Sequence, residues 1–248
     1  MTRTLLALAL LSAPSVAAAQ SFRHPSDCGD GCMTVSAYFD HGGNTDWACG
    51  GHTYGGHPGT DFAIFGGFGA VDEGRGVVAA APGVVIDAHD GEFDRCTSGD
   101  CAGGGGYGNY VELQHPDGRI TFYGHMRTGS IAVGVGDSVG CGQHLGFIAS
   151  SGYSTGPHVH FEPQAGGSFD PFGGGCSAGG SWVDQGAYLG LPSMACDAAC
   201  TPHCEGSVIV DSGCGRGDCG AYASGCTDDA LGVRCTFFAC PAVGDADV

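Results

Sequence analysis

The segment Pro157-His158-Val159-His160-Phe161-Glu162 alternates polar and apolar side chains, which is the pattern of a half-buried β-strand. Successive residues of a strand point to opposite faces. We therefore expect His158 and His160 to face one site, while Val159 and Phe161 enter the core. Two imidazoles on one strand face are two of the three protein ligands that a catalytic zinc ion requires.

A second segment, His57-Pro58-Gly59-Thr60-Asp61, offers further ligands for such a site. Pro58 and Gly59 make a helix improbable here, so the side chains of His57 and Asp61 would converge around a turn or the start of a strand. Alone, this spacing is more often an exposed His–Asp pair. Its occurrence together with the two strand histidines, and with His125 at the end of another predicted strand, favours a metal site.

The apolar pattern outside these segments predicts an all-β, mostly antiparallel fold. A turn at Pro116-Asp117-Gly118 joins two of the expected strands as a hairpin, and strict alternation along its second strand places Tyr123 and His125 on one face. No helix of normal length is expected. The predicted strands are Val77–Ala81, Val84–His89, Tyr110–Gln114, Arg119–His125, Ile131–Val135, His144–Ala149 and Pro157–Phe161.

The composition excludes some classes of partner. The chain has 248 residues, with 26 acidic residues against eight arginines, no lysine, and a formal net charge of −18. A surface this acidic repels phosphate backbones, so we expect no nucleic-acid partner. An apolar fraction of 42% is enough for a folded core.

The first nineteen residues have the layout of a secretory signal peptide. Arg3 gives a basic start, residues 5–11 are apolar, and Ala17-Ala18-Ala19 offers a small-residue cleavage site. A membrane anchor is disfavoured because the apolar run is short and Pro14 interrupts it. No later segment is apolar for long enough to span a bilayer. We therefore expect an exported protein, either periplasmic or extracellular.

All 15 cysteines follow this leader. Export places them in an oxidising compartment, so disulfides are expected. Because the count is odd, at least one thiol is free or pairs with another chain. The spacing does not give the connectivity.

The chain resembles the lysostaphin/LytM-type zinc metalloendopeptidases over roughly residues 52–163. The similarity lies in Gly56 to Phe62, the hairpin from Gly108 through Tyr123-Gly124-His125-Met126, the turn from Val135 to Gln143, and Ser154 to Glu162. It implies an open antiparallel sheet forming a groove, the duplicated hybrid motif. It also implies one catalytic zinc ion and hydrolysis of peptide bonds in peptidoglycan stems or cross-bridges.

The resemblance also assigns roles to single residues. The zinc ligands would be His57, Asp61 and His160, and the catalytic pair would be His125 and His158. Which of the pair is the general base is open. We further expect Glu162 to orient a ligand, and His52 and Tyr54 to line the groove.

Two segments depart from the family pattern: residues 66–76, and residues 92–106, in which Cys96 and Cys101 are expected to form a stapled loop at the groove rim. The expected organisation is a signal peptide (1–19), a zinc metalloendopeptidase domain (20–172), a loosely structured Gly-rich linker (173–195) and a Cys-rich module (196–248). In this module Cys196, Cys200, Cys204 and His203 have spacing compatible with a structural zinc, but export favours disulfides. The role of the module is open.

The leading functional hypothesis is a secreted zinc endopeptidase of peptidoglycan. One alternative is a catalytically inactive relative that binds the wall or regulates other proteins; it is disfavoured because all three candidate ligands and both auxiliary histidines are present. Another is an exported protease of Gly-rich proteins, which would use the same site. The scissile bond, the target wall and the oligomeric state are left open by the sequence.

Overall fold

A computed structural model describes residues 20–197 and, beyond them, the backbone of five short strands between residues 202 and 236. The first nineteen residues, predicted as a signal peptide, lie outside the described residues. So do most of residues 196–248, predicted as a Cys-rich module. In the described part of the chain, no helix is long and apolar enough to cross a membrane.

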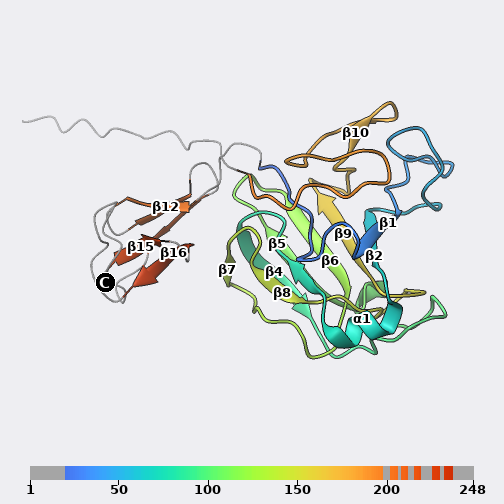
Figure 1. The fold of residues 1–248 in the computed structure, drawn as a ribbon, viewed down its shortest axis with the longest axis horizontal. Helices are drawn as coiled ribbons and strands as arrows, with labels where there is room; N and C mark the ends of the chain where they lie inside the picture. Colours follow the sequence, from blue (N-terminus) through green and yellow to red (C-terminus); the bar gives the residue numbers. More distant parts are fainter. Residues whose placement is uncertain are drawn as a thin grey trace, which may run out of the picture.

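The fold is all-β, as predicted, and its main element is an open seven-stranded antiparallel sheet (Figure 1). The strand order is β1-β2-β9-β6-β5-β4-β7. These strands span Met33–Ala37 (β1), Thr60–Ile64 (β2), Gly83–His89 (β4), Asn109–Gln114 (β5), Ile120–Met126 (β6), Ser138–Val139 (β7) and His158–Gln164 (β9). The neighbours β2, β9 and β6 are far apart in sequence, and together they form the centre of the sheet.

The remaining elements are short. A separate antiparallel pair joins Gly76–Val78 (β3) to His144–Phe147 (β8), and a smaller one joins Gly173–Gly174 (β10) to Ser177–Ala178 (β11). The helices are α1, Gly67–Glu73, and a 3₁₀ turn, Gly104–Gly106. The strands beyond residue 200 are Pro202–Glu205 (β12), Val208–Asp211 (β13), Gly215–Asp218 (β14), Gly225–Asp229 (β15) and Gly232–Thr236 (β16).

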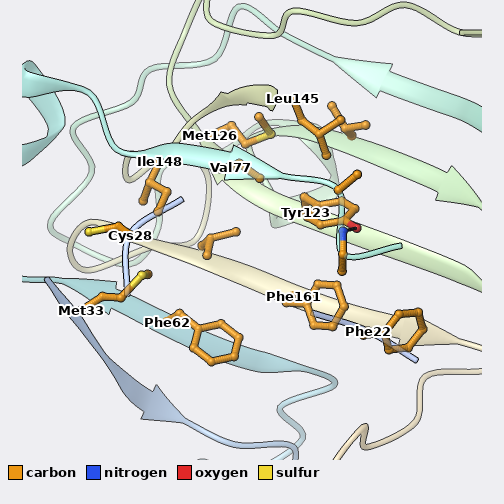
Figure 2. Close-up of a cluster of buried hydrophobic side chains, with 14 of the residues drawn as sticks. Phe22, Cys28, Met33, Phe62, Val77, Tyr123, Met126, Leu145, Ile148 and Phe161 are labelled. Carbon is orange, nitrogen blue, oxygen red and sulfur yellow. Dashed lines mark hydrogen bonds between the residues drawn. The ribbon is translucent and has the colours of Figure 1, made fainter. Parts of the chain in front are cut away.

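The core lies between one face of the main sheet and the β3–β8 pair. Phe62, Tyr123 and Phe161 of the sheet belong to one buried cluster with Val77 and Leu145 (Figure 2). Burying aromatic rings in this way is the main stabilising contribution available to a glycine-rich chain. The opposite face of β2, β9 and β6 is thereby left free to carry polar side chains.

Several sequence expectations differ from the structure. The segment Ile131–Val135 is not a strand, although its backbone bonds to β8 through the Ala132 amide and the Leu145 carbonyl, 2.9 Å apart. The strand predicted at Val77–Ala81 is shorter: β3 ends at Val78, and the alanines that follow lie in the core outside the regular strand, where Ala79 still bonds to the backbone of Gly142 and Gln143. The atypical segment 66–76 contains α1, which the sequence pattern did not reveal.

Residues 173–197 are not a loose connector. Trp182 is buried against Phe22 and Phe161, and Phe22 exchanges backbone hydrogen bonds with Ser181 and Val183. The segment is also tied to the sheet domain by the disulfides Cys49–Cys176 and Cys141–Cys196. Glycine and serine content indicated flexibility, but one tryptophan and two cross-links are enough to order the chain. The domain boundaries themselves stay a prediction.

Candidate active site

Three candidate metal ligands meet on the polar face of the sheet. Asp61 on β2 and His160 on β9 are direct partners in the antiparallel pairing, and His57 precedes β2 by one turn. The Oδ1 atom of Asp61 lies 3.1 Å from Nε2 of His57 and 2.9 Å from Nδ1 of His160, and these two nitrogens are 3.2 Å apart. All three side chains are buried.

The hydrogen bonds to the outer ring nitrogens of His57 and His160 determine which nitrogen of each ring faces the point where the three ligands meet. The Nδ1–H of His57 donates to the Tyr38 carbonyl at 2.7 Å, so the Nε2 of neutral His57 presents a lone pair. The Nε2 of His160 lies 3.2 Å from a carboxylate oxygen of Glu162 and donates to it, which leaves Nδ1 for the centre. Two imidazole lone pairs and one carboxylate oxygen face one another there. This donor set fits a zinc ion with one position open.

The electrostatics also favour a cation at this point. Burial alone would raise the pKa of Asp61, but positive charge on His158 and the His160 and His57 imidazoles beside the carboxylate hold it well below its usual range. Burial alone would lower the pKa of His160, yet its hydrogen bonds to Asp61 and Glu162 raise it to about 9. Without a metal ion, the carboxylates of Asp61 and Glu162 therefore keep His160 protonated. A bound cation would replace the charge of that proton.

Glu162 is held by residues that the sequence did not single out. It accepts hydrogen bonds from the Tyr107 hydroxyl and the Gln164 amide, both at 2.8 Å, and from the Ser168 hydroxyl. Burial opposes the charge of Glu162, but the hydrogen bond from His160 and those from its other partners lower its pKa to about 2. Tyr107 lies in a loop far along the chain from Glu162, so no local pattern could have indicated this contact.

The two candidate catalytic histidines lie beside the ligands, with their ring centres 4.6 Å apart. The Nδ1–H of His158 donates to the Gly156 carbonyl at 2.8 Å, and its Nε2 lies 3.5 Å from Asp61 Oδ1. The Nδ1–H of His125 donates to the Ser151 carbonyl at 2.7 Å. In its neutral form, either ring thus holds its proton on Nδ1 and leaves Nε2 able to accept one.

His125 reaches this face through an irregular backbone. Tyr123 points into the core, so strict alternation along β6 would place His125 there too. Instead, His125 has a left-handed φ of 60°, and the pairing of β6 with β9 ends at Gly124. The side chain is thereby turned toward His158. Burial and the nearby charges of His158 and His160 lower the pKa of His125 well below its usual range, so the ring is neutral near pH 7.

A cavity of about 400 Å³ opens beside the site. Tyr54 is half exposed at its wall, stacks on the His57 ring at 4.4 Å, and donates from its hydroxyl to Asp61 Oδ2 at 3.3 Å. His52 is not among the lining residues; its Nε2 donates to the Val35 carbonyl at 3.0 Å. The cavity is lined by Ser36, Ala37, Tyr54, Asp61, Ala63, Ile64, Thr155, Gly156, Pro157 and His158.

Residues 55–171 match the model of Peptidase family M23, so this part of the chain is a domain of the M23 metallopeptidase family. This span contains all three candidate ligands and both histidines of the pair.

The relatives of the chain include named peptidoglycan enzymes. Over 116 residues the chain is 35% identical to the DD-carboxypeptidase/endopeptidase Mpg of Neisseria meningitidis, a match that covers 47% of this chain and 22% of that protein. It is 32% identical over 106 residues to the peptidoglycan DD-endopeptidase ShyA of Vibrio cholerae, covering 43% and 20%. The chain thus matches only about a fifth of the length of these relatives. Among solved structures, the catalytic domain of the prophage-encoded M23 protein EnpA of Enterococcus faecalis is 28% identical, with a TM-score of 0.41, and the match covers 58% of this chain and 92% of that one.

Proposed function

We propose that this protein is an exported zinc-dependent endopeptidase that hydrolyses peptide bonds in peptidoglycan. The observation that carries the proposal is the convergence of His57, Asp61 and His160 on one point, with His125 and His158 beside them. The names of the relatives support peptidoglycan as the substrate. The predicted leader, together with the pairing of every cysteine between residues 20 and 197, supports export.

Zinc, when bound by His57, Asp61 and His160, would polarise the scissile carbonyl and lower the pKa of water toward about 7. His158 holds its own proton on Nδ1, so its Nε2 can accept the proton that an attacking water must lose. Once protonated, the same nitrogen can pass that proton to the leaving amine. His125 has the same tautomer and also begins as an acceptor. It can hydrogen-bond a developing oxyanion only after it has gained a proton.

The walls of the cavity suit a small, uncharged substrate residue. Ala37 and Ala63 present only methyl groups. Among the lining residues, Asp61 is the only acidic one and His158 the only basic one. Short side chains and glycine would fit such walls, which is compatible both with peptidoglycan peptides and with the alternative of Gly-rich proteins. The same site serves both, so only a substrate test separates them.

The decisive experiment incubates the zinc-loaded protein with purified peptidoglycan and identifies the released peptides by mass spectrometry. We expect new amino termini to appear, to disappear when a chelator removes zinc, and to be missing with the His160→Ala variant. Binding to the wall without release of peptides would support the inactive relative instead. Faster cleavage of a Gly-rich protein than of peptidoglycan would support the third hypothesis.

A further inference from the structure

One segment, Ser150–Gly156, orients both imidazoles of the catalytic pair. Its carbonyl at Ser151 accepts the Nδ1–H of His125, and its carbonyl at Gly156 accepts the Nδ1–H of His158. The tautomer of each ring is therefore set by main-chain atoms of the same short loop. A shift of this loop would move both Nε2 atoms together.

Buried hydroxyl groups hold this segment in place. The Ser154 hydroxyl lies 2.9 Å from the Gly156 carbonyl, 3.4 Å from Nδ1 of His158 and 2.7 Å from the Ser150 hydroxyl. The Ser150 hydroxyl in turn donates to the Cys96 carbonyl at 2.6 Å. Both serines are buried, so water does not supply replacement partners for them.

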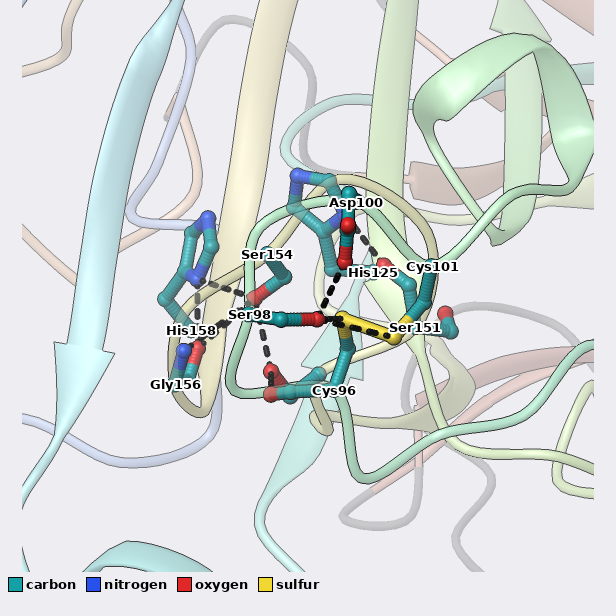
Figure 3. The surroundings of a disulfide bond; sticks show 10 residues. Cys96, Ser98, Asp100, Cys101, His125, Ser151, Ser154, Gly156 and His158 are labelled. Carbon is teal, nitrogen blue, oxygen red and sulfur yellow. Dashed lines mark hydrogen bonds between the residues drawn. A yellow bond between two sulfur atoms is a disulfide. The ribbon is translucent and has the colours of Figure 1, made fainter.

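The chain of hydroxyls ends on the loop closed by the Cys96–Cys101 disulfide (Figure 3). The backbone of this loop also bonds to the segment directly: the Cys96 amide donates to the Ser150 carbonyl at 2.8 Å, and the Gly99 amide to the Ser154 carbonyl at 3.1 Å. Gly99 has a φ of 80°, which a glycine adopts without strain. The disulfide keeps the loop short enough to present these groups together.

The metal ligands are supported elsewhere. His57 is fixed by the Tyr38 carbonyl and His160 by Glu162, and neither bond involves the stapled loop or Ser150–Gly156. Given the proposed function, we propose that the Cys96–Cys101 loop, acting through Ser150 and Ser154, is a positioning device for His158 and His125. It affects turnover and leaves zinc binding unchanged.

The first test replaces both cysteines by serine in the full-length protein. The Cys96→Ser/Cys101→Ser variant should bind zinc as tightly as the wild type, with a similar KM and a kcat lower by about ten- to a hundredfold, which is the scale for misplacing a reacting group. The matched control is Cys28→Ser/Cys32→Ser, which opens a disulfide of similar loop size away from these residues and should keep kcat within about twofold. An unchanged kcat in the first variant, or a loss of zinc together with kcat, would overturn the proposal.

The second test separates orientation from general stability. Ser154→Ala removes the hydroxyl beside His158 and should lower kcat, whereas Ser154→Thr keeps a hydroxyl and should restore most of it. The tautomers of His125 and His158 can be followed by ¹⁵N NMR of the imidazoles, independently of any substrate. The wild type should show Nδ1–H for both rings, and Ser154→Ala a mixture for His158. If the wild type cleaves nothing, the proposed function fails, but the NMR spectra still decide this inference: unchanged tautomers in Ser154→Ala would refute it.

Discussion

The two groups of residues in the site are held by different kinds of structure. Asp61 and His160 lie on regular strands and are direct partners in the pairing of β2 with β9. His125 has a left-handed backbone, and both His125 and His158 are oriented by carbonyls of a loop. The positions of Asp61 and His160 thus follow from strand register, whereas the ring orientations of His125 and His158 depend on the conformation of a loop. Metal binding and turnover should therefore respond separately to substitution.

The largest effect is expected for His160→Ala, which removes one of the three candidate metal ligands. Removing one of two imidazole ligands leaves His57 and Asp61 as an inadequate pair, so zinc and peptidoglycan hydrolysis should be lost together. Metal analysis and hydrolysis are to be measured on the same preparation. A variant that keeps one zinc per chain would show that His160 is not a ligand.

His158→Ala removes one of the two candidate catalytic histidines, which are oriented by loop carbonyls. All three candidate ligands remain, so the zinc content should match the wild type, while turnover falls by roughly a hundredfold or more, the usual scale for a general acid–base group. His125→Ala should behave in the same way. The same two measurements apply. Should His158→Ala lose its metal, the division between the two groups would be wrong.

Glu162→Gln tests how much the hydrogen bond from His160 to Glu162 contributes to zinc affinity. The amide keeps the size of the side chain but removes the charge that faces Nε2 of His160. Zinc affinity should fall by about tenfold, measured by competition with a chelator. Glu112→Gln is a suitable control, because it removes a carboxylate from strand β5, which is separated from β9 by β6. An equal loss of affinity in both variants would point to overall charge as the cause.

A further prediction concerns the acid sensitivity of the fold, which must be known before pH–activity profiles of the ligand variants and the catalytic-pair variants are compared. His24 is fully buried against Phe62, and burial, reinforced by the charge of Arg23, lowers its pKa to about 3. The unfolded chain, with a pKa of about 6.5, binds more protons between these values, so stability is lost as the pH falls from about 6.5 toward 3. Between pH 7 and pH 5 this histidine should cost about 2 kcal/mol of unfolding free energy.

Thermal and denaturant unfolding of His24→Phe at both pH values checks this assignment. The variant should lose less stability on acidification than the wild type. His144→Phe, at a less buried position, should retain the wild-type sensitivity. If His24→Phe is as acid-sensitive as the wild type, the loss arises in other groups.

The parts of the fold that were predicted correctly are strands and turns whose formation depends on residues close together in the sequence. The β-prone run from Val84 to His89 matches β4, and the turn after Gln114 correctly joins β5 to β6. The period of two placed His158 and His160 on one face because β9 is regular. The residue roles in the site rest on the resemblance to a family and stay predictions.

The parts that were missed depend on contacts between distant segments. Trp182 is ordered by Phe22 and Phe161, far away along the chain, and nothing in the glycine-rich sequence around it indicates this. His125 faces the site only because its backbone leaves the regular strand conformation. Tyr107 is likewise recruited by the carboxylate of Glu162 across the sheet. Patterns of neighbouring residues carry no signal for such contacts.

The Cys49–Cys176 disulfide joins residues separated by 127 positions, and all five histidine and aspartate residues of the site lie between them. This part of the chain is therefore a closed covalent ring. A single cut by a protease in any of its surface loops leaves one molecule, in which both new ends remain linked through residues 49 and 176. Release of a fragment requires two cuts or reduction. Where proteases are present, nicking and inactivation of this protein thus become separate events.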